Sequence, residues 1–328
     1  MKKRNIKIEP EWHNGVKTVA NAFVKLWQKW EQYGNFVDSR TGDVVVGGST
    51  SGAIVPAALA LASEYYQNPL YMKVAKLSAQ KMYNDYVAKG ITCGGPGDAL
   101  QNPDSESAYA MLESFSILYE KTGEPQWLEY AEEIALQFAT WVMAYDYNYD
   151  STCLFGRMKM KTKGTVFANT QNKHGSPGIC TYSGLALMRL YRATSQSHFL
   201  ELLQEITLSI PQYMSHNTRP IADMPPGWIN ERVSTTDWFE GIGEIKAGST
   251  WAETAMLLTA TELPSVYVDI KFGKIYCFDH LQTQIIKNNQ NFIHIKVHNP
   301  TNFTSQFNVF LENKEMKSKA WTENQLFD

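Results

Sequence analysis

The chain has 328 residues, of which 44% are hydrophobic and 19% charged, and its formal net charge at pH 7 is −3. This composition is typical of a globular chain with one large core or two domains, and its mild acidity argues against a nucleic-acid-binding protein. It contains no apolar run of about eighteen residues, so we expect neither a transmembrane helix nor a membrane partner.

The opening residues, MKKRNIKIEPEW, are basic but lack an apolar segment, so no signal peptide is predicted. We therefore expect a cytoplasmic protein by default. The alternative is a secreted or periplasmic protein without its N-terminal part.

Eight helices are expected along residues 11–263. The first covers 11–33 and the last 249–262; between them lie three hairpins, each with an apolar helix, a short polar turn and a second, amphipathic helix. The hairpin turns centre on Pro69, Pro125 and Ser197. Both prolines suit the first turn of the following helix, where a missing N–H costs nothing.

Long, glycine-rich loops separate the hairpins, at residues 34–50, 90–105, 144–177 and 216–248. Because long loops alternate with short turns, antiparallel helices would place all the long loops at one face. The helices after the loops open on small residues, at 49–53, 105–108, 176–178 and 248–250, which would let them crowd into an inner ring. The pattern predicts an α/α toroid over residues 1–264 with its functional face at the loops.

After Pro264 the hydrophobic pattern changes to a period of two. The segments that alternate in this way are SVYVDIKF, KIYCFDHLQTQIIKN, NFIHIKVHNP and SQFNVFLEN. They predict strands, and hence a small β-sheet or sandwich as a second domain over residues 265–328. We favour a packing role for this domain over sugar binding.

The repeated hairpins resemble the six-hairpin glycosidase superfamily over about residues 11–263, as do the loops GGPGDALQNPDSES, VFANTQNKHGSPGIC and MPPGWINERVSTTDWFEGIGE. The resemblance implies an (α/α)6-barrel glycoside hydrolase that acts on an oligo- or polysaccharide. A complete barrel of this type has twelve helices, so eight imply a reduced toroid or the C-terminal portion of a longer enzyme. No catalytic residue is carried over, because no motif matches one family's catalytic pair.

Glycoside hydrolysis needs two carboxyl groups across the scissile bond, so we look for acids in the long loops. The stretch 94–107 carries Asp98, Asp104 and Glu106 beside glycines, directly before a helix. Asp104 or Ser105 is predicted to cap that helix, which leaves Asp98 and Glu106 as catalytic candidates. The alternative is that these acids only cap the helix and complement its dipole.

A second set of candidates lies in residues 225–244. Glu231 and Asp237 are the predicted partner carboxylates. Trp228, Trp238 and Arg232 in the same loop are predicted to bind the sugar. A surface pair between Glu231 and Arg232 would contribute only ~0–1 kcal/mol, so stability alone is a weak reason for the pair.

A third set lies in residues 168–178, a run of hydrogen-bonding side chains. The predicted sugar-binding residues here are Asn169, Gln171, Asn172 and His174. Lys173, His174 and Arg157 could hold the carboxylate of a uronic acid. The alternative is an ordinary solvated loop.

Motifs for other chemistries are missing from the sequence. It has no nucleophile elbow, no P-loop and no HExxH, and GGPGD lacks the strand–helix context of a dinucleotide site. The four cysteines are far apart and form no CxxC pair. We therefore predict no cofactor and no metal.

Two other functions remain open. A polysaccharide lyase on the same scaffold could use Asn172, His174 and Tyr182 beside a uronate. A carbohydrate-binding remnant without catalysis would follow if the missing helices held part of the site.

Overall fold

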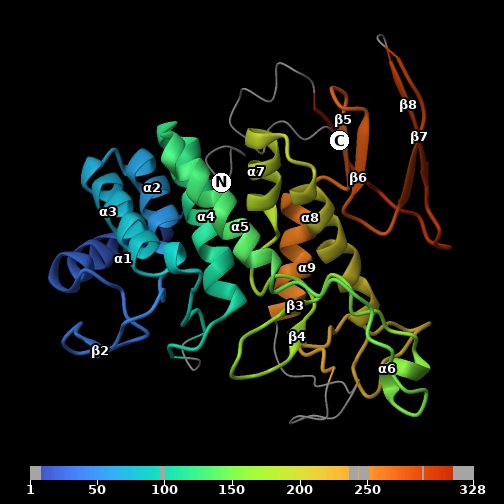
Figure 1. Cartoon of the computed structure of the whole chain (residues 1–328), viewed down its shortest axis with the longest axis horizontal. Coiled ribbons are helices and arrows are strands. Elements are labelled where there is room, and N and C mark those ends of the chain that lie inside the picture. The colour runs from blue at the N-terminus through green and yellow to red at the C-terminus, as the bar shows by residue number, and fades with distance from the viewer. Residues whose placement is uncertain (1–8, 97–99, 236–242, 244–250, 290–291, 313–328) are drawn as a thin grey trace. The chain divides into compact units, whose positions relative to one another are not determined.

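A computed structural model describes residues 9–96, 100–235, 243, 251–289 and 292–312 (Figure 1). The chain divides into two compact units: unit 1 comprises residues 1–139 and 169–172, and unit 2 comprises 140–168 and 173–328. The described residues form nine α-helices, two short strand pairs between them, and a small group of strands after α9. This confirms a mainly helical chain that ends in β-structure. The expected boundary at residue 264 falls inside unit 2 and stays a prediction.

Unit 1 is built from five helices, one short hairpin and a 3₁₀ turn. These elements are α1 (Pro10–Trp30), β1 (Phe36–Val37), β2 (Val44–Val46), α2 (Val55–Tyr66), α3 (Pro69–Asp85), η2 (Val87–Lys89), α4 (Ser105–Thr122) and α5 (Pro125–Ala139). The hairpins α2–α3 and α4–α5 turn at the predicted prolines, each of which is the first residue of its helix. Asn68 caps α3 by accepting a hydrogen bond from Leu70 N.

Helix α4 forms the centre of unit 1, where it packs against both α2 and α5. It is buried along most of its length, whereas α5 buries only one face. Its Phe115 packs between Trp127 of α5 and Tyr83 of α3. The apolar first helix and amphipathic second helix of the sequence pattern therefore correspond to a central and a peripheral helix in this hairpin.

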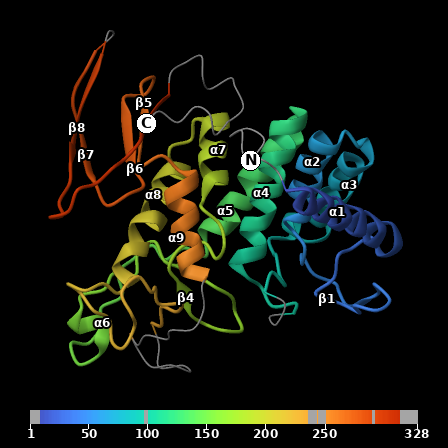
Figure 2. The same cartoon turned by 180° about the vertical axis from the view of Figure 1, so that it is seen from behind.

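Unit 2 begins with irregular chain and continues with helices and strands. Its elements are α6 (Leu154–Arg157), β3 (Val166–Phe167), β4 (Gly175–Ser176), α7 (Leu185–Thr194), α8 (His198–Ser209), η4 (Ile210–Tyr213), α9 (Trp251–Glu262), β5 (Val266–Asp269), β6 (Lys274–Cys277), β7 (Gln282–Asn288), β8 (Ile293–His298) and β9 (Val309–Glu312). The hairpin α7–α8 turns at the predicted Ser197, and α9 lies beside α8 in both views (Figure 2).

The predicted C-terminal strands are confirmed and form two layers. One layer is a three-stranded sheet of order β6-β5-β9, in which β5 and β9 are parallel; the other is the antiparallel hairpin β7–β8. Alternate residues of β8, Ile293, Ile295 and Val297, pack against the buried Val266 and Val268 of β5. The apolar residues of the period-two pattern therefore lie on the face of the β7–β8 hairpin that packs against the sheet.

Helix starts and loop structure differ from expectation in three places. Helix α7 begins at Leu185 instead of near 176–178, because Gly178, Cys180 and Gly184 all have positive φ angles, which interrupt a right-handed helix. Helix α2 begins at Val55, after a run of turns. The loops that were predicted as irregular contain the hairpins β1–β2 and β3–β4 and the short helix α6.

Of the helices in the described ranges, none combines the length and apolarity needed to cross a lipid bilayer.

Candidate functional site

The acid-bearing loop before α4 in unit 1 is organised around Asp104. Its carboxylate is fully buried and caps the helix, accepting from Ser107 N at 2.6 Å, Ser107 Oγ at 2.8 Å and Gly95 N at 3.0 Å. Burial raises the pKa of Asp104 above its ordinary value, while these hydrogen bonds oppose the shift. The capping role predicted for Asp104 is confirmed.

The small residues of this loop allow its backbone to lie on the capped helix start. A Cβ atom on Gly95 would approach Asp104 Oδ1 to 2.5 Å and Ser107 N to 2.8 Å. Asn35 fixes the backbone of this loop at two points, because its Nδ2 donates to Gly94 O and Leu100 O, both at 3.2 Å. The absence of a side chain at Gly95 therefore has a structural cause.

Of the catalytic candidates in this loop, Glu106 is half-buried in the first turn of α4, and Asp98 lies outside the described residues. Both stay predicted catalytic residues.

Residues 169–172 join unit 1 beside this loop. Asn169 pairs with Asp104 as an antiparallel bridge, Thr170 N donates to Pro103 O at 3.1 Å, and Asn102 Nδ2 donates to Gln171 Oε1 at 3.2 Å. The side chain of Asn169 is buried and accepts from the backbone N–H groups of Gln171 and Asn172. It shapes the turn, whereas Gln171 is exposed and Asn172 half-buried.

In unit 2, His174 directly precedes the short strand β4. The imidazole is buried, and its Nδ1 lies 2.8 Å from Gly175 O. Strand β4 is bonded on one side to β3 and on the other to Val233, through Gly175 N to Val233 O at 2.9 Å and Val233 N to Gly175 O at 2.8 Å. This bridge brings the start of β4 to the loop that carries Glu231 and Arg232.

The loop 228–234 is held rigidly at its backbone. Ile229 bridges Met214, Asn230 N donates to Tyr213 O at 3.1 Å, and the buried amide of Asn230 donates to Arg232 O. Trp228, by contrast, is 52% exposed, so its indole is available to a ligand. The predicted Asp237 and Trp238 lie outside the described residues.

A carboxylate that sequence reasoning missed lies in the first turn of α9. Glu253 Oε1 accepts a hydrogen bond from Ile229 N at 2.9 Å. Its other oxygen, Oε2, is buried and accepts no hydrogen bond from any residue that the structure describes. Glu253 is thus tied to the loop that carries Glu231, two residues beyond the bonded Ile229. In the sequence its only signal is an acid within the helix STWAETAMLLTATE.

Five residues of unit 2 lie on segments that these hydrogen bonds join. We call them the 229–253 cluster: Asn230, Glu231, Arg232, Glu253 and His174. It combines two carboxyl groups, a guanidinium, a buried amide and a buried imidazole on backbone fixed by hydrogen bonds. Groups of these kinds can exchange protons with a ligand and orient hydroxyl or carboxylate groups. No group of His, Cys, Asp and Glu suited to a metal ion occurs in the described part of the chain.

Comparison with known proteins gives no family for this chain: no protein-family model matches it, and no curated protein does so significantly.

Proposed function

We propose that the chain is a glycoside hydrolase that cleaves an oligo- or polysaccharide by carboxyl acid–base catalysis, on a reduced α/α toroid of the six-hairpin type. One observation carries this proposal: Glu253 of α9 is bonded at 2.9 Å to the loop that also bears Glu231. Glu231 and Glu253 are therefore carried by two segments that a hydrogen bond joins. Hydrolysis of a glycosidic bond uses two carboxyl groups about 5–9.5 Å apart, one on each side of the bond.

The neighbours of the two carboxyl groups suit a sugar ligand. The exposed face of Trp228 offers a flat apolar surface on which the C–H face of a pyranose can pack. Arg232 supplies a charge-assisted donor that would bind a uronate carboxylate or a hydroxyl. The buried Asn230 fixes the loop backbone through its bond to Arg232 O, which keeps these groups in position.

The test is the amide substitution of each carboxyl group, Glu231→Gln and Glu253→Gln, assayed on a panel of neutral and uronate-containing oligosaccharides for new reducing ends. General acid–base catalysis contributes about 10²–10⁴-fold, so each variant should lose rate by about that factor. Glu205→Gln is the matched control. Glu205 lies on α8 and forms an exposed ion pair with Lys163, so its substitution should leave the rate unchanged.

The other outcomes separate the alternatives. Wild-type rates in both amide variants would exclude the 229–253 cluster as the catalytic site and direct the same test to Glu106. Products that absorb in the ultraviolet, lost in His174→Ala, would indicate a lyase. Sugar binding without any product would indicate a binding protein.

A further inference from the structure

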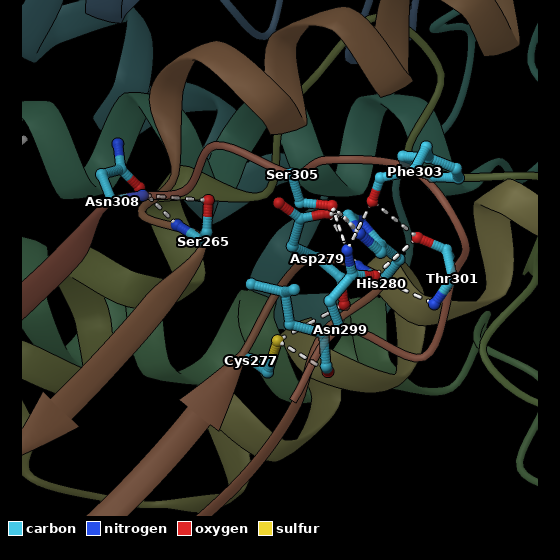
Figure 3. Close-up of polar contacts among 10 residues, drawn as sticks. Ser265, Cys277, Asp279, His280, Asn299, Thr301, Phe303, Ser305 and Asn308 are labelled. Atoms are coloured by element: carbon cyan, nitrogen blue, oxygen red, sulfur yellow. Dashed lines mark hydrogen bonds and ion pairs between the residues drawn. The ribbon is translucent and has the colours of Figure 1, made fainter. Parts of the chain in front are cut away.

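A chain of hydrogen bonds joins three side chains among the C-terminal strands of unit 2 (Figure 3). His280 Nδ1 lies 2.6 Å from Asp279 Oδ1, and His280 Nε2 lies 2.8 Å from Ser305 Oγ. Asp279 and His280 follow β6, and Ser305 lies between β8 and β9. A carboxylate and a hydroxyl on opposite nitrogens of one imidazole is the arrangement that activates serine in hydrolases.

The direction of each hydrogen bond follows from its partners. An ionised carboxylate can only accept, so Nδ1 carries the ring proton and Nε2 of the neutral imidazole is an acceptor. Asn299 Nδ2 donates to Ser305 Oγ at 3.0 Å, which leaves the serine hydrogen to point at Nε2. The bonds therefore run from Asn299 through Ser305 to His280, and from His280 to Asp279.

The cluster is open to reagents. The side chains of His280 and Asp279 are 28% and 34% exposed. The ring of Phe303, itself largely exposed, lies 5.5 Å from that of His280 and forms an apolar surface beside it. The backbone N–H of Ser305 donates no hydrogen bond within the described residues, so it is available to an oxyanion at the serine.

The turn at residues 299–303, just before Ser305, is closed by the side chain of Asn299. Asn299 Oδ1 accepts from Thr301 N at 2.9 Å, and its Nδ2 donates to Phe303 O at 2.7 Å. These contacts already fix residues 299–303. Ser305 lies beyond this turn, and its hydroxyl is held by Asn299 Nδ2 and His280 Nε2.

We propose that Ser305 is the nucleophile of a second site, an esterase site for short acyl esters, with His280 as its general base and Asp279 as the positioning residue. Ser305 Oγ attacks the acyl carbon while its proton passes to His280 Nε2. The C–O bond of the ester breaks, and the alcohol leaves with that proton. Water, deprotonated by Nε2, then cleaves the acyl-serine to a carboxylic acid and restores the serine.

The experiment is covalent labelling of the full chain with a fluorophosphonate probe, followed by peptide mass spectrometry and by hydrolysis of p-nitrophenyl acetate. We expect an adduct on Ser305 that is lost in Ser305→Ala, together with a loss of ester hydrolysis. Asp279→Asn should slow labelling by at least about tenfold while the adduct stays on Ser305, because the imidazole is no longer held in the required tautomer.

Ser265→Ala is the matched control. Ser265 directly precedes β5, and its Oγ accepts a hydrogen bond only from Asn308 N, at 3.4 Å, among the described residues. It should label at the wild-type rate. Thermal melting of each variant shows whether it is folded, and His280→Gln gives a second loss-of-labelling test if Ser305→Ala fails to fold. An unlabelled wild-type chain, or an adduct that persists in Ser305→Ala, would overturn the proposal.

Discussion

Asp104 organises the loop before α4, and its burial makes the stability of the fold depend on pH. The carboxylate satisfies three donors at the start of α4, yet it is fully buried, and burial raises its pKa. A folded-state pKa above the unfolded value means that the folded chain binds the proton more tightly. The associated stability is present below about pH 4 and is lost as pH rises through the folded pKa.

We therefore predict that the free energy of unfolding of the wild type falls relative to that of Asp104→Asn as pH rises above about 4, by at most about 1.4 kcal/mol per pH unit. Urea unfolding of both proteins across this range measures the difference. Asp38→Asn is a control of opposite sign, because bonds from Arg40 lower the pKa of Asp38. A wild-type advantage that grew with pH at Asp104 would show that its hydrogen bonds outweigh burial.

Glu253 shows why a residue of the proposed site can escape sequence reasoning. Its sequence context is an ordinary helix start, and nothing local distinguishes it from a dipole-stabilising acid. Its significance comes from a contact 24 residues away along the chain, to Ile229 N. Contacts of this kind depend on the fold and leave no periodic or spacing signal.

At the scale of elements, α7 is attached to the C-terminal sheet by a buried ion pair. Arg192 Nε donates to Glu312 Oε2 at 2.7 Å and Nη2 to Oε1 at 3.1 Å, with both side chains almost fully buried. Tyr267 of β5 donates to the same carboxylate at 2.6 Å. The pair therefore links a helix to both parallel strands of the sheet.

We predict that Arg192→Met lowers the free energy of unfolding by about 3–5 kcal/mol, because it leaves the Glu312 carboxylate buried without its cation. The double variant Arg192→Met with Glu312→Leu should recover most of this loss, since it removes both charges. Lys163→Met, which breaks an exposed pair with Glu205, should change the free energy of unfolding far less, because solvent screens that pair. Denaturant unfolding measures all three, and equal losses at the two sites would contradict the importance of burial.

The elements that could be predicted from sequence are those with local signals. Pro69 and Pro125 mark hairpin turns, and Asp104 marks a cap, because each acts through its own backbone neighbours. The predicted start of α7 is wrong by several residues. Gly178, Cys180 and Gly184 have positive φ angles, so the helix begins only after them. Ring closure of the helices has no local signal, and the toroid stays a proposal.

At the scale of the whole molecule, the chain is interleaved between its two units. Residues 169–172 belong to unit 1, where they bond to the loop before α4, although the residues on either side belong to unit 2. The sequence run that looked like a single sugar-binding loop, 168–178, is therefore divided at residue 172. Asn169, Gln171 and Asn172 belong to one unit and His174 to the other.

Each unit contains fully buried apolar residues, so a substitution at one of them should destabilise mainly the unit that contains it. Leu118 of α4 is fully buried in unit 1, and Leu118→Ala should cost about 2–5 kcal/mol there. Hydrogen exchange followed by mass spectrometry should show faster exchange of the α4 and α5 amides, with β5 amides such as those of Val266 and Val268 unchanged. Leu203→Ala, at a buried position of α8, is the converse control and should act on unit 2. Equally faster amide exchange in both units after either substitution would mean that the two units unfold together as one cooperative body.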